Sequence, residues 1–98
     1  MQNLIGKKVI VRGDRSGVFF GTLAQCDNRE VTLNDCRRIW YWEGAASISQ
    51  IAQEGVKKPE RCKFTVTVDS IVILDAIEII PCTDQAIKSI ESVKVWKI

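Results

Sequence analysis

The 98-residue chain contains no histidine. Histidine is the side chain that most often acts as a general base near neutral pH and the commonest metal ligand, so its absence removes the central group of most catalytic schemes. No serine or cysteine has an evident activating partner in the sequence either. We therefore predict a protein that is not an enzyme, with no catalytic residues, no metal and no cofactor.

The sequence also lacks a metal-binding cysteine spacing. The four cysteines contain no Cys-x-x-Cys pair; they are Cys26, Cys36, Cys62 and Cys82. The first residues show no secretory signal, because the basic pair at residues 7–8 follows apolar residues instead of preceding a long apolar stretch. Disulfides are typical of exported chains, so we expect four free, buried thiols and a protein that stays in the cytoplasm.

The sequence lacks an apolar run long enough for a membrane helix. The longest nearly apolar segment, Ile71–Ile80, is interrupted by Asp75 and Glu78 and is far shorter than the roughly 20 residues that span a bilayer. With 46% apolar and 27% charged residues, the whole chain, residues 1–98, is predicted to form one small globular domain. Because a small core leaves apolar segments uncovered, we expect Ile71–Ile80 to favour self-association into a dimer or a tetramer.

The excess of positive charge is small. Fourteen basic residues face twelve acidic ones, and a net charge of +2 is too low for a protein that holds long nucleic acid mainly through charge. The distribution is uneven, because residues 1–42 contain seven basic and four acidic side chains, a balance of +3, and five of the six arginines. Arginine suits phosphate contacts and stacking on flat rings, so a small anionic partner is predicted, not a long nucleic acid.

The pattern of β-branched and aromatic residues predicts an antiparallel sheet in the first half of the chain. We expect strands over Lys8–Arg12, Val18–Cys26 and Glu30–Trp42. Asp27-Asn28 is a two-residue turn between the last two strands, made of residue types that tolerate positive φ. The resulting hairpin brings the loop Gly13–Gly17 close to Arg37 and Arg38, although a bulge would swap the faces.

The second half of the chain combines short helices with further strands. Ser47 and Gln50 match a capping box, so a helix is expected over Ile48–Glu54. Gly55 supplies its left-handed stop, and Thr83 caps a second helix. The remaining strands are expected at Lys63–Asp69, within Ile71–Ile80 as one strand or two, and at Val93–Ile98. The predicted fold class is mainly antiparallel β with two short helices, an α+β small barrel or half-rolled sheet.

The densest functional signal lies at residues 37–42, where two arginines precede three aromatic residues in four positions. Side chains alternate along a strand, so one face would carry Arg38, Trp40 and Trp42. The opposite face would carry Arg37, Ile39 and Tyr41. An indole or guanidinium plane stacks on a nucleobase, and arginine binds phosphate, so the segment suits a nucleotide. Two alternatives stay open: one tryptophan could anchor the core, and the two arginines could be outward charges.

The loop Gly13–Gly17 is the second candidate. Its glycines let backbone N–H groups turn toward an anion, and Arg15 and Ser16 add donors beside Arg12. Small loops of this composition are mostly simple turns. The loop supports an anion-binding site only because it is predicted to lie beside the two arginines of the aromatic segment. The predicted ligand-binding residues are Arg12, Arg15, Ser16, Arg37, Arg38, Trp40, Tyr41 and Trp42.

Further motifs accompany the aromatic segment. Gly44-Ala45 follows Arg-Arg-Ile-Trp-Tyr-Trp, and Val9–Arg12, Ser16–Val18 and Ile77–Cys82 complete the pattern. With these motifs the sequence resembles a large family of short, uncharacterised tailed-phage proteins. Such proteins are similar to viral sponges that sequester the nucleotide signals of antiphage defence, of the anti-CBASS or anti-Thoeris type. The resemblance implies a homo-oligomer that binds its ligand without cleaving it, with the ligand at a subunit boundary.

The sequence thus predicts a phage immune-evasion sponge that binds a cyclic di- or trinucleotide in the cytoplasm of the infected bacterium. Two other functions stay open. A single-stranded nucleic-acid-binding small barrel would use the same aromatic strand for stacking, although the near-neutral charge argues against it. A structural or adaptor protein of the phage particle would use the aromatic residues as an assembly interface.

Overall fold

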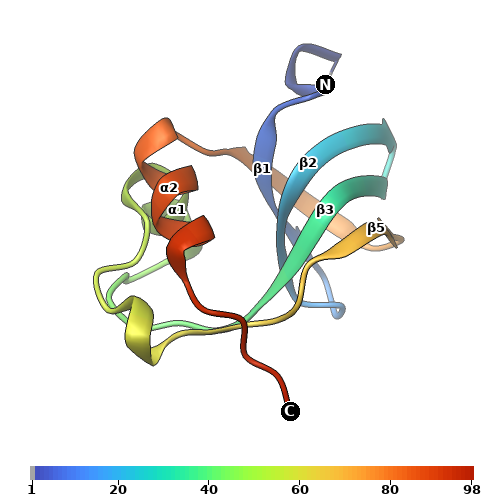
Figure 1. The fold of residues 1–98 in the computed structure, drawn as a ribbon. Helices are drawn as coiled ribbons and strands as arrows, with labels where there is room; N and C mark the ends of the chain where they lie inside the picture. The colour runs from blue at the N-terminus through green and yellow to red at the C-terminus, as the bar shows by residue number, and fades with distance from the viewer. Residues whose placement is uncertain (1) are drawn as a thin grey trace.

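The computed structural model describes residues 2–98, in which two α-helices pack on one side of a curved six-stranded sheet (Figure 1). The strands are β1 (Lys8–Gly13), β2 (Val18–Asp27), β3 (Glu30–Tyr41), β4 (Lys63–Phe64), β5 (Val68–Ile73) and β6 (Ala76–Pro81). The helices are α1 (Ile48–Glu54) and α2 (Asp84–Ser92), with 3-10 turns η1 (Gln2–Leu4) and η2 (Pro59–Arg61). The predicted class, mainly antiparallel β with two short helices, is confirmed.

The sheet curls because the long strand β3 pairs with two different strands along one of its edges. All pairings between these strands are antiparallel, in the order β4-β3-β2-β1-β6, and β5 also pairs with β3. The first half of β3 pairs with β5 and its second half with β4. The result is an open barrel (Figure 1), in which β5 and β6 each keep one unpaired edge within the described residues.

The β2–β3 hairpin has a different register from the predicted one. Asp27 pairs with Glu30, so the turn begins one residue later than expected, at Asn28, which takes a positive φ of 56°. Two bulges follow. At one of them Gly21 approaches β3 so closely that a Cβ there would lie 2.9 Å from the carbonyl oxygen of Asn34. After these shifts Arg37 lies opposite Phe20 and Arg38 lies opposite Phe19, so each arginine keeps the face that the predicted register gives it.

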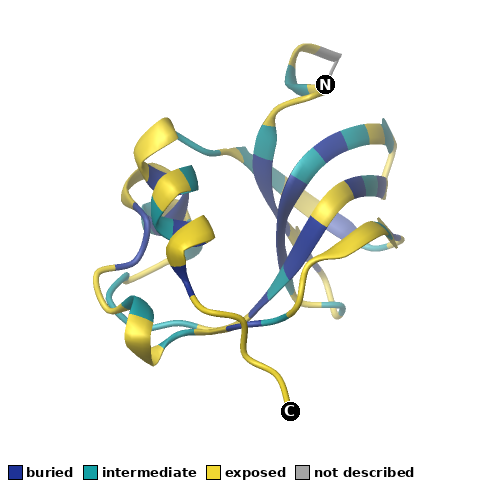
Figure 2. Cartoon of the chain, in the orientation of Figure 1, coloured by how far each residue is buried: buried dark blue, intermediate teal, exposed yellow. Residues whose placement is uncertain are grey.

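Two apolar clusters occupy the two faces of the curved sheet. The cluster inside the barrel includes Val9, Val11, Phe19, Leu23, Leu33 and Cys36. The cluster on the outer face, covered by the helices, includes Ile10, Phe20, Ile39, Ile51, Phe64 and Ile90. Figure 2 shows buried residues along β1, β2 and β3 and on parts of both helices. Neighbouring residues of one strand therefore face different clusters, as the two-residue period of a strand requires.

Both helices begin at their predicted caps, and α1 also ends at its predicted stop. The Ser47 hydroxyl accepts a hydrogen bond from the amide three residues on (3.2 Å), and the Thr83 hydroxyl does the same for α2 (3.1 Å). Gly55 ends α1 with a φ of 82°. A Cβ at Gly55 would lie 2.2 Å from the side chain of Ser89 in α2, so this glycine also lets the two helices pack closely.

The strand prediction for the second half is only partly correct. The segment Lys63–Asp69 is not one continuous strand: its start pairs with β3 as β4, the chain leaves the sheet over residues 65–67, and it pairs with β3 again from Val68 as β5. The interruption leaves Val66 43% exposed. The segment Ile71–Ile80 is shared between β5 and β6, one of the two predicted alternatives. The expected last strand at Val93–Ile98 is reduced to a single bridge between Val95 and β4.

All four cysteines are free thiols. Cys36 is fully buried in the barrel, whereas Cys26, Cys62 and Cys82 are only partly buried, so the expectation of buried thiols holds fully for one of them. Burial raises the pKa of the Cys36 and Cys82 thiols to about 12. No helix in residues 2–98 is long and apolar enough to cross a membrane.

Candidate functional site

Arg37 lies in the interior and contacts the protein itself. It is 6% exposed. Its guanidinium donates hydrogen bonds of 3.0–3.4 Å to the backbone carbonyls of Phe64, Thr65, Ile90 and Lys94. The C-terminal end of α2 favours a cation, and burial lowers the pKa of Arg37. The geometry assigns Arg37 to the fold, where it joins β3 to β4 and the end of α2, and the predicted phosphate-binding set is corrected accordingly.

The loop Gly13–Gly17 binds an anion, but the anion is the protein's own Asp75. The Asp75 carboxylate accepts hydrogen bonds from the backbone amides of Arg15 (2.8 Å) and Ser16 (3.0 Å) and from the Ser16 hydroxyl. These bonds, led by the one from the Ser16 hydroxyl, hold the pKa of Asp75 below its ordinary value. The pattern of the loop correctly indicates an anion site, but Asp75 occupies it, so Ser16 leaves the candidate set.

The three remaining arginines of the predicted set lie in different environments. Arg12 forms an exposed ion pair with Glu78, with 2.7 Å between Nε and Oε1. The Arg38 guanidinium lies 4.5 Å from the centroid of the Phe19 ring and donates to a carbonyl of the loop, so the predicted contact between Arg38 and the loop is confirmed. Arg15 is exposed and forms no ion pair with any described residue.

The two tryptophans of the aromatic segment occupy different environments. Trp40 is 61% exposed, whereas Trp42 packs against the outer-face cluster and donates from Nε1 to the Ala45 carbonyl (3.1 Å). A register shift between Ile39 and Tyr41 breaks the expected alternation, so the two indoles do not share a face. Trp42 therefore supports the core, and only Trp40 presents its indole to solvent.

The stacking partner of Trp40 is Trp96, which no sequence pattern singled out. The two ring centroids lie 6.1 Å apart with 17° between the ring planes. Trp96 is 44% exposed, and its amide donates to the Phe64 carbonyl (2.8 Å), which fixes the tail against β4. The signal that points to it is composition alone, a lone aromatic residue among the lysines of the tail.

Lys63 places a positive charge near both the tryptophan pair and a third aromatic ring. Its Nζ lies 5.5 Å from the centroid of the Trp96 ring and 5.8 Å from that of Tyr41, both within cation–π range. Tyr41 pairs with Lys63 across β3 and β4 and is 44% exposed. We call Trp40, Trp96, Tyr41 and Lys63 the aromatic platform.

A carboxylate borders the aromatic platform. The Tyr41 hydroxyl donates to Glu43 Oε2 (2.8 Å), and Arg61 Nη1 lies 3.6 Å from Glu43 Oε1. The hydrogen bond to Glu43 raises the pKa of Tyr41. The Glu43 carboxylate is thus fixed in orientation at the surface, and it keeps lone pairs that can accept further hydrogen bonds.

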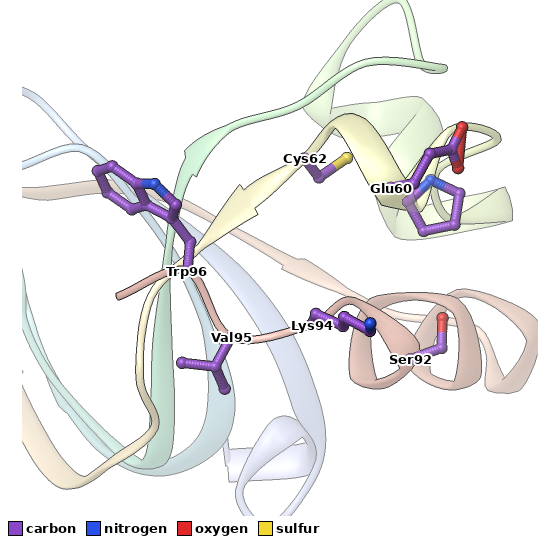
Figure 3. A pocket seen from close by; sticks show the side chains of 7 residues that line it. Glu60, Cys62, Ser92, Lys94, Val95 and Trp96 are labelled. Atoms are coloured by element: carbon purple, nitrogen blue, oxygen red, sulfur yellow. The ribbon is translucent and has the colours of Figure 1, made fainter. Parts of the chain in front are cut away.

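A pocket of about 470 Å³ adjoins Trp96 (Figure 3). It is lined by Pro59, Glu60, Cys62, Ser92, Lys94, Val95 and Trp96. In Figure 3, Glu60 and Cys62 lie on one side of the pocket and the end of α2 with the tail on the other. The volume falls within the range of roughly 300–1,000 Å³ that is usual for small-molecule sites. The pocket offers a cation at Lys94 and an acceptor at Glu60.

The open barrel of antiparallel strands has an Sm-like fold. Its structure is similar to the crystal structure of a heptameric archaeal Sm protein, described with implications for the eukaryotic snRNP core. The TM-score is 0.55 at 20% sequence identity, over 84% of this chain and 94% of the Sm chain, a similarity of fold. Residues 6–90 match the model of DUF6948, a domain of unknown function, and the chain belongs to that family. No curated protein matches the sequence.

Proposed function

We propose that this protein is a non-enzymatic binding protein whose nucleotide ligand stacks on the aromatic platform. The supporting observation is the Trp40–Trp96 pair, two nearly parallel indoles open to solvent beside the Lys63 ammonium. Stacking of a base on an exposed aromatic ring is worth about 1–3 kcal/mol, and a neighbouring cation favours phosphate. Folding by itself does not require an exposed indole pair or an ammonium without an ion pair beside it.

The ligand that we favour is a small cyclic di- or trinucleotide. The pocket beside Trp96 has the volume of a small-molecule site, and the net charge of +2 is low for a protein that binds long nucleic acid. In this proposal the protein is a phage-encoded sponge that sequesters a nucleotide signal of antiphage defence in the cytoplasm of the infected bacterium. A sponge acts by mass action, so it requires nanomolar affinity, about −12 kcal/mol.

We further propose that copies of the chain assemble through the open edges of the barrel. The segment of β5 and β6 exposes Val72 (53%), Leu74 (72%) and Ile77 (43%). Unpaired strand edges associate readily with another chain, and the archaeal Sm protein of similar fold is heptameric. Contact between two different edges is head to tail, in contrast to the two-fold contact of a simple dimer, and it forms a closed ring when the rotation between neighbouring copies closes.

Light scattering tests this assembly. Ile77→Lys places a charge on the β6 edge, so we expect a shift of the wild-type oligomer toward the monomer with an unchanged circular dichroism spectrum. Ile5→Lys is the matched control, because Ile5 has the same 43% exposure but lies outside the strands. A wild-type protein that is monomeric at micromolar concentration contradicts the proposed assembly.

Binding of single-stranded nucleic acid is a second candidate function, favoured by the fold and by the position of Trp40. The related Sm structure was described for its implications for the snRNP core. Trp40 is the more exposed indole of the pair and does not line the pocket, so successive bases of a strand have access to it. Single-strand binding would weaken steeply with added salt, because cations of the protein displace counterions from the phosphates.

Isothermal titration calorimetry with cyclic dinucleotides, cyclic trinucleotides and a single-stranded oligonucleotide, each at two salt concentrations, separates these functions. We expect nanomolar binding of one cyclic ligand, weakened about 10- to 100-fold by Trp40→Ala and unchanged by Ile5→Ala. Micromolar or weaker binding of every cyclic ligand excludes the sponge, and tight, salt-sensitive oligonucleotide binding then selects the second function. A protein that binds no nucleotide but enters phage particles is instead a structural or adaptor protein.

A further inference from the structure

We propose that the aromatic platform recognises a unit of two nucleotides, with one base on the Trp40–Trp96 pair, the linking phosphate on Lys63 and the second base on Tyr41. This inference rests on the proposed nucleotide-binding function and specifies the size of the ligand and the base preference of the second position. Its basis is the order of chemical groups along the surface: aromatic, cation, aromatic, carboxylate.

Lys63 is the centre of this arrangement. Its ammonium is within 6 Å of two separate rings, 5.5 Å from the centroid of Trp96 and 5.8 Å from that of Tyr41. The two centroids are therefore at most 11.3 Å apart, the sum of these distances. Lys63 is exposed and forms no ion pair with any residue of the described chain, so its charge is available to a ligand. A phosphodiester between two stacked bases would place its negative charge beside this ammonium.

Tyr41 is suited to hold the second base. Its ring is 44% exposed, lies 5.8 Å from the Lys63 ammonium, and is not part of the stacked tryptophan pair. The backbone fixes its position, because Tyr41 and Lys63 are paired across β3 and β4. A ring held by a strand loses little conformational freedom when a base stacks on it, which favours affinity.

Glu43 gives the second position a base preference. Its carboxylate is held by the Tyr41 hydroxyl at 2.8 Å and by Arg61 at 3.6 Å, and its side chain remains 32% exposed. An ionised carboxylate only accepts hydrogen bonds, so it favours a base edge with adjacent N–H donors. Guanine presents two such donors, at N1 and N2, whereas adenine presents an acceptor at N1. We therefore expect guanine to be preferred on Tyr41.

Calorimetry with GMP, AMP and the linear dinucleotides pApA, pApG and pGpA tests the two-nucleotide unit. We expect the wild-type protein to bind a guanine-containing dinucleotide at least about 10-fold more tightly than GMP. Tyr41→Ala should reduce the dinucleotide affinity to that of a mononucleotide and leave AMP binding unchanged. Trp40→Ala should weaken the binding of mononucleotides and dinucleotides alike.

Two further variants isolate the base preference. Glu43→Gln should abolish the preference for guanine over adenine while it preserves the advantage of the dinucleotide. Tyr41→Phe keeps the ring and removes the hydroxyl that orients Glu43, so it should retain the advantage of the dinucleotide and lose part of the guanine preference. Circular dichroism melting verifies that each variant is folded before its affinity is interpreted.

The outcomes distinguish failure of this inference from failure of the proposed function. Equal affinity for GMP and the dinucleotides, with no effect of Tyr41→Ala, overturns the two-nucleotide unit but leaves base stacking on Trp40 intact. A dinucleotide advantage that shows no base preference in the wild type overturns the role of Glu43. Absence of binding by every nucleotide, cyclic ligands included, overturns the proposed function and this inference together.

Discussion

The loop Gly13–Gly17 and the aromatic platform are both built from groups that bind nucleotides, but only one of them is free to do so. In the loop, the amides and the Ser16 hydroxyl already hold Asp75, and the nearby guanidinium of Arg38 lies over a phenylalanine ring. In the platform, two stacked indoles face solvent, and Lys63 forms no ion pair with a described residue. The contrast shows that a candidate site in this fold is identified by groups without an internal partner, more than by residue type.

The largest effect in this comparison is expected from Arg37, the guanidinium most completely used by the fold. Arg37→Met leaves four backbone carbonyls without their donor, so we expect the free energy of unfolding to fall by about 3 kcal/mol or more, measured by chemical denaturation. Arg15→Ala is the control, because Arg15 is exposed, and its expected effect is below about 0.5 kcal/mol. Similar losses in both variants would remove the distinction between fold and surface arginines.

The two tryptophans of the aromatic segment provide a second test. Trp42→Ala should cost about 2–3 kcal/mol of stability, less than for a completely buried tryptophan, because it packs on the outer-face cluster. Trp40→Ala should cost about 1 kcal/mol, the value of an exposed aromatic pair, and should act mainly on ligand affinity. Thermal melting and calorimetry on both variants measure the two effects. A stability loss at Trp40 that matches the loss at Trp42 would assign both indoles to the core.

The smallest effect is a pH dependence at Asp75. Because the folded-state pKa of Asp75 is lowered, its contribution to stability is fully present above its unfolded pKa of about 4 and is lost as the pH falls through the lower folded value. The difference in unfolding free energy between wild type and Asp75→Asn should therefore be larger at pH 6 than at pH 2.5, measured by urea denaturation at each pH. A difference that does not change with pH would mean that the loop does not depend on the charge of Asp75.

Features determined by near neighbours in the sequence could be predicted. The caps at Ser47 and Thr83 and the stop at Gly55 act within a few residues; both helices begin at these caps and α1 ends at Gly55. The chemistry of the loop Gly13–Gly17 is local as well, so its affinity for an anion was foreseeable. The identity of that anion was not, because Asp75 is about 60 residues away along the chain.

Features that depend on strand register or on distant segments were beyond the reach of local patterns. The shift at Ile39 separated the two indoles of the aromatic segment, and no residue type in the sequence indicates it. Arg37 lies inside the fold because distant segments, β4 and the end of α2, supply carbonyl partners for its guanidinium. Trp96 reaches Trp40 only because the tail is fixed to β4. The sequence correctly predicted that the aromatic segment lies on a strand. The stacking partner Trp96 and the cation Lys63 come from two other segments.

β2 contributes to both apolar clusters, because the Phe19 ring packs inside the barrel and the Phe20 ring packs under the helices. Melting the helical layer would remove Ile51, Ala52 and Ile90 from the cluster and expose Phe20, Ile10 and Ile39 on the sheet. We therefore expect the helices and the sheet to unfold together, so the helical and strand contributions to the circular dichroism spectrum should be lost in one cooperative transition on heating.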